Sequence, residues 1–310
     1  MNYQADSSTF HGIYPMLYAF WADNGSLDEE AMTRQVEHAI EVGADGIAVL
    51  GLVSEAHRIS RSERLTLLRL VSHILDRRLP YSVTVPGESA ADQISFANDC
   101  LDAGADWLVL QPPGAIRLEE QALIDWFANV ADGIGCPLGV QNNPEHLLNA
   151  FTADGLLKLH AQVPKITILK GEGPAAGIEP LISRSRTTLS TFGGHGGLEH
   201  ISLLRAGAAG LIPAPDCLSL QVKIHQLWRS GDPEKQGQAV AIQREILPLI
   251  VFMNRSIDYL LCYGRQFMAK RLGLTGTTDR FGTIRPTRFG MEEIQRFLDE
   301  LAESEARWLG

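Results

Sequence analysis

A short motif that joins the end of a helix to the start of a strand recurs in the chain and constrains the fold more than any other feature. Its copies are Gly43-Ala44-Asp45, Gly104-Ala105-Asp106 and, with alanine in the last place, Gly207-Ala208-Ala209. Each copy follows an amphipathic stretch and precedes a short aliphatic run. A glycine just past a helix, followed by a continuous apolar run, is typical of a helix that leads into a buried parallel strand.

Further apolar runs fit between these copies, with amphipathic stretches separating them. Besides the strands after each motif copy, we expect strands at residues 12–18, 81–85, 137–141, 165–170 and 188–192. Helices are expected near residues 27–42, 60–78, 89–104, 118–132, 152–161, 175–185, 197–206 and 217–229. Alternation repeated about eight times predicts an α/β protein with a (β/α)₈ TIM barrel. An open doubly wound sheet is the main alternative, and the lack of a GxGxxG after the first strand disfavours it.

The pattern changes after Ser230-Gly231-Asp232-Pro233, where strands give way to helices. Residues 234–272 and 290–308 have helical patterns, and Pro248 is expected to kink the first of them. The sequence therefore predicts a barrel with the active site at residues 1–230 and a C-terminal helical extension at residues 231–310.

Composition narrows the function classes. The net charge of −10 and pI near 5.4 disfavour a nucleic-acid partner, which would select a basic face. The cysteines have no metal-ligand or paired spacing, which predicts free thiols in a reducing compartment; they are Cys100, Cys136, Cys217 and Cys262. The polar start MNYQADSSTF and the lack of an apolar run near ~20 residues predict a cytoplasmic protein with no membrane partner.

One lysine stands where a barrel enzyme places its chemistry. Active sites of such barrels are built at the carboxyl ends of the strands. Lys170 ends the apolar run that begins at Ile166. Burial favours a neutral amine, which can attack a carbonyl carbon to form a Schiff base. A lysine at a strand end more commonly extends into solvent, so the prediction depends on the rest of the chain.

Several pieces of the sequence together resemble the dihydrodipicolinate synthase / N-acetylneuraminate lyase family of Schiff-base-forming barrel enzymes. The resemblance covers nearly the whole chain. It rests on Gly12-Ile13-Tyr14-Pro15, on Gly51-x-x-x-Glu55 followed by Ile59-Ser60-x-x-Glu63-Arg64, on Asn142-x-Pro144 and on Lys170. It implies the barrel fold, an imine on Lys170 and a homodimer or homotetramer.

The chain also departs from the family pattern at positions that handle substrate. The family's paired threonines are Leu52 and Val53, and the tyrosine of its Tyr-Asn-x-Pro is Gln141, which cannot act as an acid or base near neutral pH. The tyrosine after the fourth strand is absent, and the arginine that meets a substrate carboxylate is replaced near His146. These departures argue against true dihydrodipicolinate synthase activity and standard sialic-acid lyase activity.

The candidate site follows from these positions. We expect catalytic roles for Lys170, Gln141, Ser54 and His195: Ser54 supplies a lost hydroxyl, and His195, flanked by glycines, replaces the missing proton carrier. The amides of the loop from Gly51 are expected to hold a carboxylate. The predicted substrate-binding residues are Gly51, Leu52, Val53, Glu55, Asn142, His146, Gly194 and Pro213, with Glu55 in a more structural part.

The function predicted is a lyase, an aldolase or dehydratase, that acts on pyruvate or a 2-keto sugar acid. The expected partner is a small-molecule keto acid, and no metal or organic cofactor is expected because the imine on Lys170 is the electron sink. Two alternatives stay open. The missing side chains favour a keto-acid-binding protein without turnover, and the glycines around His195 allow a phosphate-binding barrel enzyme with no imine chemistry.

Overall fold

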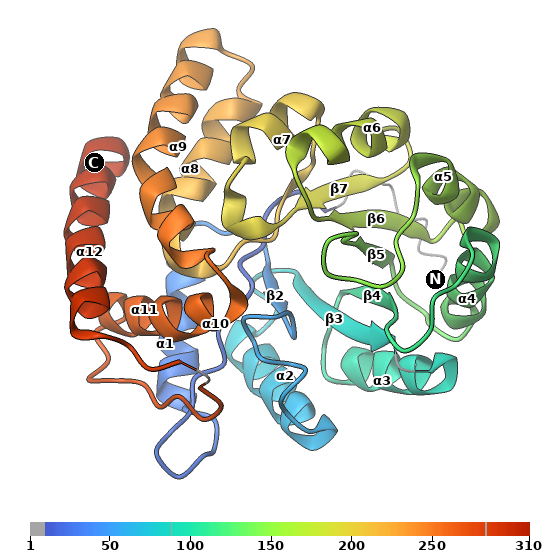
Figure 1. The fold of residues 1–310 in the computed structure, drawn as a ribbon, viewed down its shortest axis with the longest axis horizontal. Helices are drawn as coiled ribbons and strands as arrows, with labels where there is room; N and C mark the ends of the chain where they lie inside the picture. The colour runs from blue at the N-terminus through green and yellow to red at the C-terminus, as the bar shows by residue number, and fades with distance from the viewer. Residues whose placement is uncertain (1–9, 88, 283) are drawn as a thin grey trace.

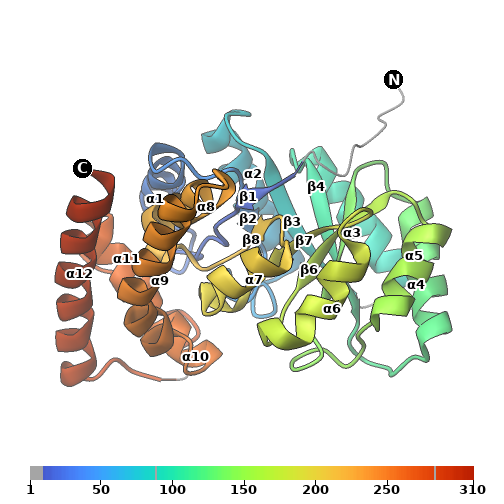
Figure 2. The same ribbon diagram turned by 90° about the horizontal axis from the view of Figure 1, so that it is seen from above.

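A computed structural model describes residues 10–310 except 88 and 283, so most of the polar N-terminal segment considered above lies outside the described residues. The chain forms eight parallel strands in one sheet with helices around it, and further helices stand on one side (Figures 1 and 2). The strands are Gly12–Ile13 (β1), Ile47–Val49 (β2), Tyr81–Gly87 (β3), Trp107–Pro113 (β4), Leu138–Asn142 (β5), Ile166–Gly171 (β6), Ser190–Gly193 (β7) and Gly210–Leu211 (β8).

The sheet is strongly curled. Its strand order is β1-β8-β7-β6-β5-β4-β3-β2, and every pair of neighbours is parallel. Beyond β1, Met16 forms a parallel bridge with Ala48 of β2, and the Ala48 amide donates to the Pro15 carbonyl at 3.0 Å. This arrangement is consistent with the predicted (β/α)₈ barrel, although the strand expected at residues 12–18 is regular only at Gly12–Ile13.

A helix follows each strand, as the alternation predicts. These helices are Glu29–Glu41 (α1), Arg61–Leu75 (α2), Ala90–Asp102 (α3), Glu120–Asp132 (α4), Ala153–Gln162 (α5), Ala175–Ser185 (α6), His200–Ala206 (α7) and Leu218–Arg229 (α8). Single turns of 3₁₀ helix, His195–Gly197 (η1) and Pro215–Cys217 (η2), precede the last two. Ser60 and Glu63 form a capping box that starts α2.

The recurring motif has the local structure that its glycines predict. Gly43, Gly104 and Gly207 have φ of +80°, +99° and +99°, a left-handed conformation that glycine adopts without a Cβ clash. The motif aspartates have a second use. Asp45 accepts the amide of Ile13 and Asp106 that of Tyr81, each at 2.8 Å, so each carboxylate fastens the start of a neighbouring strand.

Aromatic side chains pack together in the interior of the sheet. The ring of Trp107 lies 5.5 Å from that of Tyr14 and 5.7 Å from that of Phe192, with all three residues buried. Gln141 and Lys170 stand nearer the carboxyl ends of β5 and β6, where polar side chains replace these rings.

The C-terminal helices confirm a helical extension but differ from the predicted pattern. They are Pro233–Met253 (α9), Ile257–Tyr259 (α10), the π-helical turn Leu260–Gly264 (η3), Arg265–Arg271 (α11) and Arg288–Leu309 (α12). Residues 234–272 are therefore not one helix, because the chain breaks at Asn254 and turns by 103° into the next segment. Pro248 lies inside α9, and the break comes after it.

The length and hydropathy of the helices can be compared with those of a membrane-spanning helix. Among the described residues no single helix has both the length and the apolar composition needed to cross a membrane, whereas the bent pair Pro233–Met253 and Ile257–Arg271 meets that test by length and composition only.

Candidate active site

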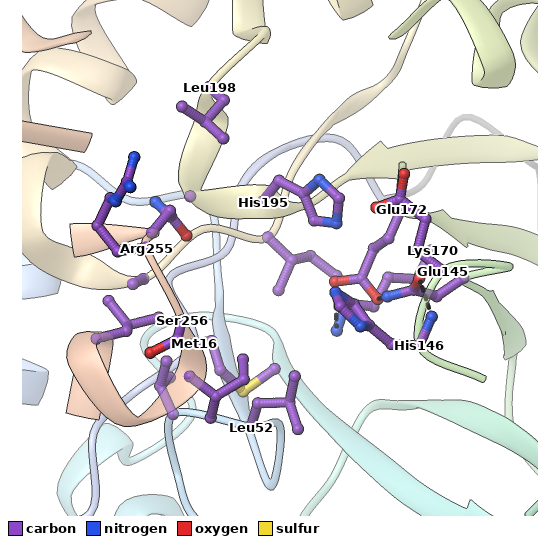
Figure 3. A pocket seen from close by; sticks show the side chains of 18 residues that line it. Met16, Leu52, Glu145, His146, Lys170, Glu172, His195, Leu198, Arg255 and Ser256 are labelled. Carbon is purple, nitrogen blue, oxygen red and sulfur yellow. Dashed lines mark hydrogen bonds and ion pairs between the residues drawn. The ribbon is translucent and has the colours of Figure 1, made fainter. Parts of the chain in front are cut away.

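A cavity of about 360 Å³ opens at the carboxyl ends of the strands. Its walls come from the segments after β1, β2, β5, β6, β7 and β8, which is the end of the sheet where the sequence predicts the site. The break between α9 and α10 supplies another part of the wall, with Arg255, Ser256 and Ile257 (Figure 3). Both the barrel and the C-terminal helical extension therefore line the cavity.

Lys170 lies in the cavity wall near the end of β6. Its side chain is buried, and the register of the sheet places it between Gln141 of β5 and Phe192 of β7. Its Nζ lies 3.6 Å from Oε1 of Glu172. The lysine thus faces the interior instead of solvent, which is the position that imine chemistry requires.

Glu172 is the most fully engaged side chain of the cavity. Gln141 Nε2 donates to its Oε2 through a short hydrogen bond, and Asn143 Nδ2 donates to the same oxygen at 3.2 Å. Burial acts to raise the pKa of the Glu172 carboxyl, but the charge of Lys170 and the bond from Gln141 outweigh it, and the net effect lowers that pKa. The group is therefore an ionised carboxylate beside the lysine.

Gln141 reaches this carboxylate and does not line the cavity itself. Its Oε1 accepts a hydrogen bond from Gln111 Nε2 at 2.9 Å, while its Nε2 faces Glu172. The chain Gln111–Gln141–Glu172 fixes the amide orientation, since each amide end has one partner of the right kind. Gln141 thus holds Glu172 next to Lys170, and the catalytic role predicted for it stays a prediction.

His195 lies in the cavity wall in a strained conformation. Its φ is +52°, which a side chain with a Cβ rarely adopts, and Gly194 and Gly196 flank it. Its buried Nε2 has no hydrogen-bond partner among residues 10–87, 89–282 and 284–310. A buried ring nitrogen without a partner is costly, so a ligand or water in the cavity would relieve it.

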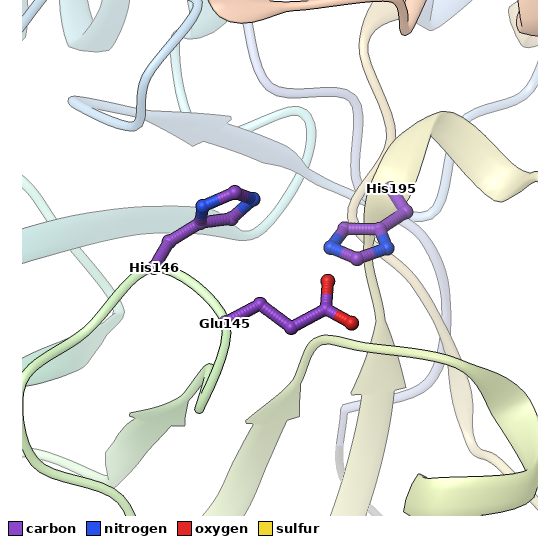
Figure 4. Close-up of side chains that lie close together, drawn as sticks. All are labelled: Glu145, His146 and His195. Atoms are coloured by element: carbon purple, nitrogen blue, oxygen red, sulfur yellow. The ribbon is translucent and has the colours of Figure 1, made fainter.

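Glu145 and His146 approach His195 from the loop after β5 (Figure 4). One ligand atom from each of the three side chains lies within 4.8 Å of the others, and the two imidazole centroids are 6.2 Å apart. Two imidazoles and a carboxylate form a donor set that zinc and similar metals accept. These side chains could hold a divalent metal or exchange hydrogen bonds with a substrate, and the sequence prediction of no metal stays a prediction.

The opposite wall is apolar. Met16, Leu52 and Val53 line it, together with Ile257 from the extension. The Gly51 amide, expected to hold a carboxylate, points at the Met16 sulfur at 3.1 Å, which is a weak acceptor. A Cβ at Gly51 would come within 2.7 Å of that sulfur, so glycine permits the close approach.

Ser54 and Glu55 both lie behind the cavity wall, within the fold. The Ser54 hydroxyl is fully buried, donates to the Leu17 carbonyl at 2.7 Å and accepts the Leu50 amide at 3.1 Å. It is saturated by backbone and lies outside the cavity lining. Glu55 is equally buried and contacts Arg265 Nη1 at 3.1 Å, which agrees with the structural part considered for it.

Three other predicted binding residues shape the site from behind. Asn142 exchanges hydrogen bonds with the backbone of Phe151, and the Pro213 carbonyl accepts the Met16 amide at 2.7 Å. A Cβ at Gly194 would come within 2.6 Å of Glu172 Oε1, so this glycine makes room for the carboxylate. These three residues are not among those that line the cavity, since their groups are used within the fold, and their predicted part in substrate binding stays a prediction.

Sequence reasoning missed Glu172, Asn143 and Arg255. A signal for Glu172 was available, since residues two apart along an extended chain point to the same face and Lys170 ends the strand. Asn143 is the variable residue of the family-like Asn142-x-Pro144, so the motif gave no reason to select it. Arg255 had no usable signal, because only the turn after α9 brings it to the cavity.

The fold and this lysine define a barrel-type class I lyase, and comparison with known proteins identifies the family. The model of the dihydrodipicolinate synthetase family matches residues 9–269, so the chain belongs to that family. It is 29% identical over 260 residues to the L-2-keto-3-deoxyarabonate dehydratase of Azospirillum brasilense, with 80% of this chain and 81% of that protein covered.

Two further relatives bear on the same family. The chain is 28% identical over 244 residues to a 4-hydroxy-tetrahydrodipicolinate synthase of Acidiphilium cryptum, with 77% of this chain and 82% of that protein covered. The sialic acid aldolase of Ruminococcus gnavus shares the fold with a TM-score of 0.86 at 18% identity, over 96% of this chain and 99% of that one. The chain is thus a lyase of this family, as the sequence predicted.

Proposed function

We propose that the protein is a Schiff-base-forming aldolase or dehydratase that acts on pyruvate or a 2-keto sugar acid. The observation that carries the proposal is the amine of Lys170, buried in the wall of a cavity at the carboxyl ends of the strands. The dehydratase among the relatives, which is named for a keto-deoxy sugar acid, supports this substrate class.

The imine would form in balanced steps. Lys170 first releases the proton of its ammonium form, and the neutral amine then adds to the keto carbon while one of its remaining protons moves to the carbonyl oxygen to give a carbinolamine. Return of the released proton to that hydroxyl lets water leave, and the nitrogen lone pair forms the C=N bond of an iminium. The iminium then accepts the electron pair released when a C–C or C–O bond of the substrate breaks.

The apolar wall argues for a substrate other than that of a true dihydrodipicolinate synthase. Leu52 and Val53 offer no hydroxyl to a carboxylate, and Gln141 offers no titratable proton. A carboxylate would instead displace the Met16 thioether from the Gly51 amide, since an ionised oxygen is the stronger acceptor. We propose that pyruvate condensation with aspartate semialdehyde is negligible.

Trapping tests this function directly. The purified protein is incubated with pyruvate and borohydride, and its intact mass is measured. We expect a stable adduct that maps to Lys170 and disappears in Lys170→Ala. An adduct of wild-type level in Lys170→Ala, or none in the native protein with any keto acid, would refute the assignment.

A binding protein without turnover is the second candidate. The loss of the family's hydroxyls at Leu52 and Val53 and of its tyrosine at Gln141 favours it. A screen of 2-keto acids and 2-keto-3-deoxy sugar acids separates the two, with product formation followed by chromatography. An adduct on Lys170 without turnover of any of them would support the binding protein.

Several broader properties complete the proposal. We infer a closed (β/α)₈ barrel, supported by the bridge from Met16 to Ala48. No resident cofactor is needed where the Lys170 iminium supplies the electron sink. A cytoplasmic homodimer or homotetramer that binds a small keto acid is the assembly expected for this family, and light scattering after size exclusion measures it.

A further inference from the structure

Glu172 stands where a proton must move once the imine exists. Its Oε1 lies 3.6 Å from the Lys170 nitrogen, and the substrate carbon next to the imine, C3, is two bonds from that nitrogen. Both side chains line the same cavity. Oε1 is therefore close to the nitrogen and to the place that C3 would occupy. C3 is the carbon that loses and gains a proton in enamine chemistry.

The remaining contacts of Glu172 direct one oxygen to this task. Gln141 and Asn143 both donate to Oε2, which leaves Oε1 facing the lysine. Gly194 provides the space for Oε1, because any larger residue would place its Cβ 2.6 Å away. One oxygen is fixed by two amides while the other faces the reacting atoms, as a general base requires.

Electrostatics favour the same assignment. The carboxylate is buried, and the charge of Lys170 keeps its pKa low, so it is ionised before substrate arrives. An iminium on Lys170 would keep the positive charge next to this carboxylate. The buried pair thus stays neutral overall from free lysine to iminium, which avoids an unpaired charge in the cavity.

We propose that Glu172 transfers the proton at C3 of the imine, in place of the tyrosine that the chain lacks, and that His195 serves the oxygen of the departing group at the cavity mouth. The inference rests on the proposed function. In the iminium-to-enamine step the C3–H bond breaks, its proton goes to Oε1, its electron pair forms the C2=C3 bond, and the C=N pair returns to nitrogen. Return of a proton from Oε1 to C3 reverses the step.

Proton exchange at C3 of pyruvate isolates this step from the rest of the reaction. In D₂O the methyl signal of pyruvate should fade in the presence of the native protein, as followed by proton NMR. Pyruvate has no leaving group, so His195 is not required. The exchange rate is divided by the fraction of Lys170 trapped by borohydride in parallel, which separates imine formation from C3 transfer.

The variants are Glu172→Gln, which keeps the shape and the amide partners, and Glu179→Gln, the same change on an exposed position of α6. We expect Glu172→Gln to form the Lys170 adduct but to lose ~10²-fold or more of the normalised exchange rate. Glu179→Gln should stay within about threefold of the native rate.

The outcomes separate the two levels of inference. No adduct in the native protein refutes the proposed function itself. With the native adduct present, a Glu172→Gln loss below about tenfold overturns the role of Glu172, as does a variant that forms no adduct even after long incubation. An equal loss of exchange in His195→Gln and Glu172→Gln also overturns it, because the C3 proton would then not be handled by Glu172 alone.

Discussion

Two buried ion pairs in this protein use the same kinds of residue for different ends. Glu55 and Arg265 lie 3.1 Å apart with side chains that are 0% and 2% exposed. Lys170 and Glu172 lie 3.6 Å apart with side chains that are 7% and 10% exposed. The pairs differ in what else surrounds them, and that difference separates a structural contact from a reactive one.

The first pair is enclosed by further partners. Glu55 also contacts Arg58 at 3.4 Å and accepts the Trp21 indole at 3.4 Å, while Arg265 reaches Asp279 at 3.4 Å. It ties the loop after β2 to the extension. In the second pair both amide donors bind Oε2 of Glu172, and both side chains line the cavity. A buried pair is thus available for chemistry only where one side of it is left to a ligand.

Breaking the enclosed pair should have the largest effect on stability. Arg265→Ala removes the nearer cation of the buried Glu55 carboxylate and leaves it only Arg58 at 3.4 Å, so we expect a loss of about 3 kcal/mol in the free energy of unfolding, measured with urea. Glu172→Gln should change that free energy by about 1 kcal/mol or less, since the amide keeps its neutral partners and a lysine that loses its counter-ion can become neutral. Equal losses in both variants would remove the distinction between the pairs.

Acid–base capacity at the cavity mouth is the next test. His195→Gln should lower kcat by ~10²-fold on a substrate with a departing oxygen or carbon fragment, because the unpartnered ring nitrogen in the cavity wall can donate or accept a proton and an amide cannot. The matched change His73→Gln alters an exposed residue of α2 and should leave kcat unchanged. A loss below about threefold for His195→Gln would reduce it to an ordinary loop residue.

Threonines can be placed at positions 52 and 53, where the family has them. Leu52→Thr with Val53→Thr should lower the pyruvate concentration for half-maximal trapping by about tenfold, since two hydrogen bonds to a carboxylate contribute roughly 1–2 kcal/mol. Leu52→Val is the matched control, because valine has the shape of threonine without the hydroxyl. An equal shift in the control would show that space, and not hydrogen bonding, limits pyruvate binding.

Asp216 is a third buried carboxyl, and its hydrogen-bond donor is a neutral hydroxyl instead of a cation. It accepts hydrogen bonds from the Tyr18 hydroxyl at 3.1 and 3.2 Å, and burial raises its pKa to about 7. Between its usual pKa of 3.8 and about pH 7, Asp216 holds a proton in the folded state but not in the unfolded state. The free energy of unfolding therefore falls as the pH rises through this range, and above pH 7 the folded protein carries the full cost of a buried charge.

Asp216→Asn should remove that penalty. We expect the variant to gain about 1–2 kcal/mol over the native protein at pH 8 and little at pH 4, where both are neutral. Thermal unfolding at the two pH values measures the difference. A gain of the same size at both would mean that packing, and not ionisation, sets the cost of this carboxyl.

The local parts of the fold could be predicted from the sequence because they depend on neighbouring residues. The motif glycines at 43, 104 and 207 have the left-handed φ that ends a helix, and the apolar runs after them form strands. Lys170 was predicted for the same reason, as the last residues of an apolar run reach the carboxyl end of the sheet. The break at Asn254 was missed, because helical composition continues on both sides of it.

The partners of each polar side chain were decided only by the tertiary structure. Ser54, Glu55 and Asn142 have residue types suited to binding substrate, yet backbone and Arg265 occupy their hydrogen-bonding groups. Glu172 stands two residues from Lys170 in the chain, but its role depends on amides from another strand and on the space at Gly194. Sequence spacing governs which way a side chain points. Whether its hydrogen-bond donors and acceptors are left for a substrate depends on groups that the fold brings from distant segments.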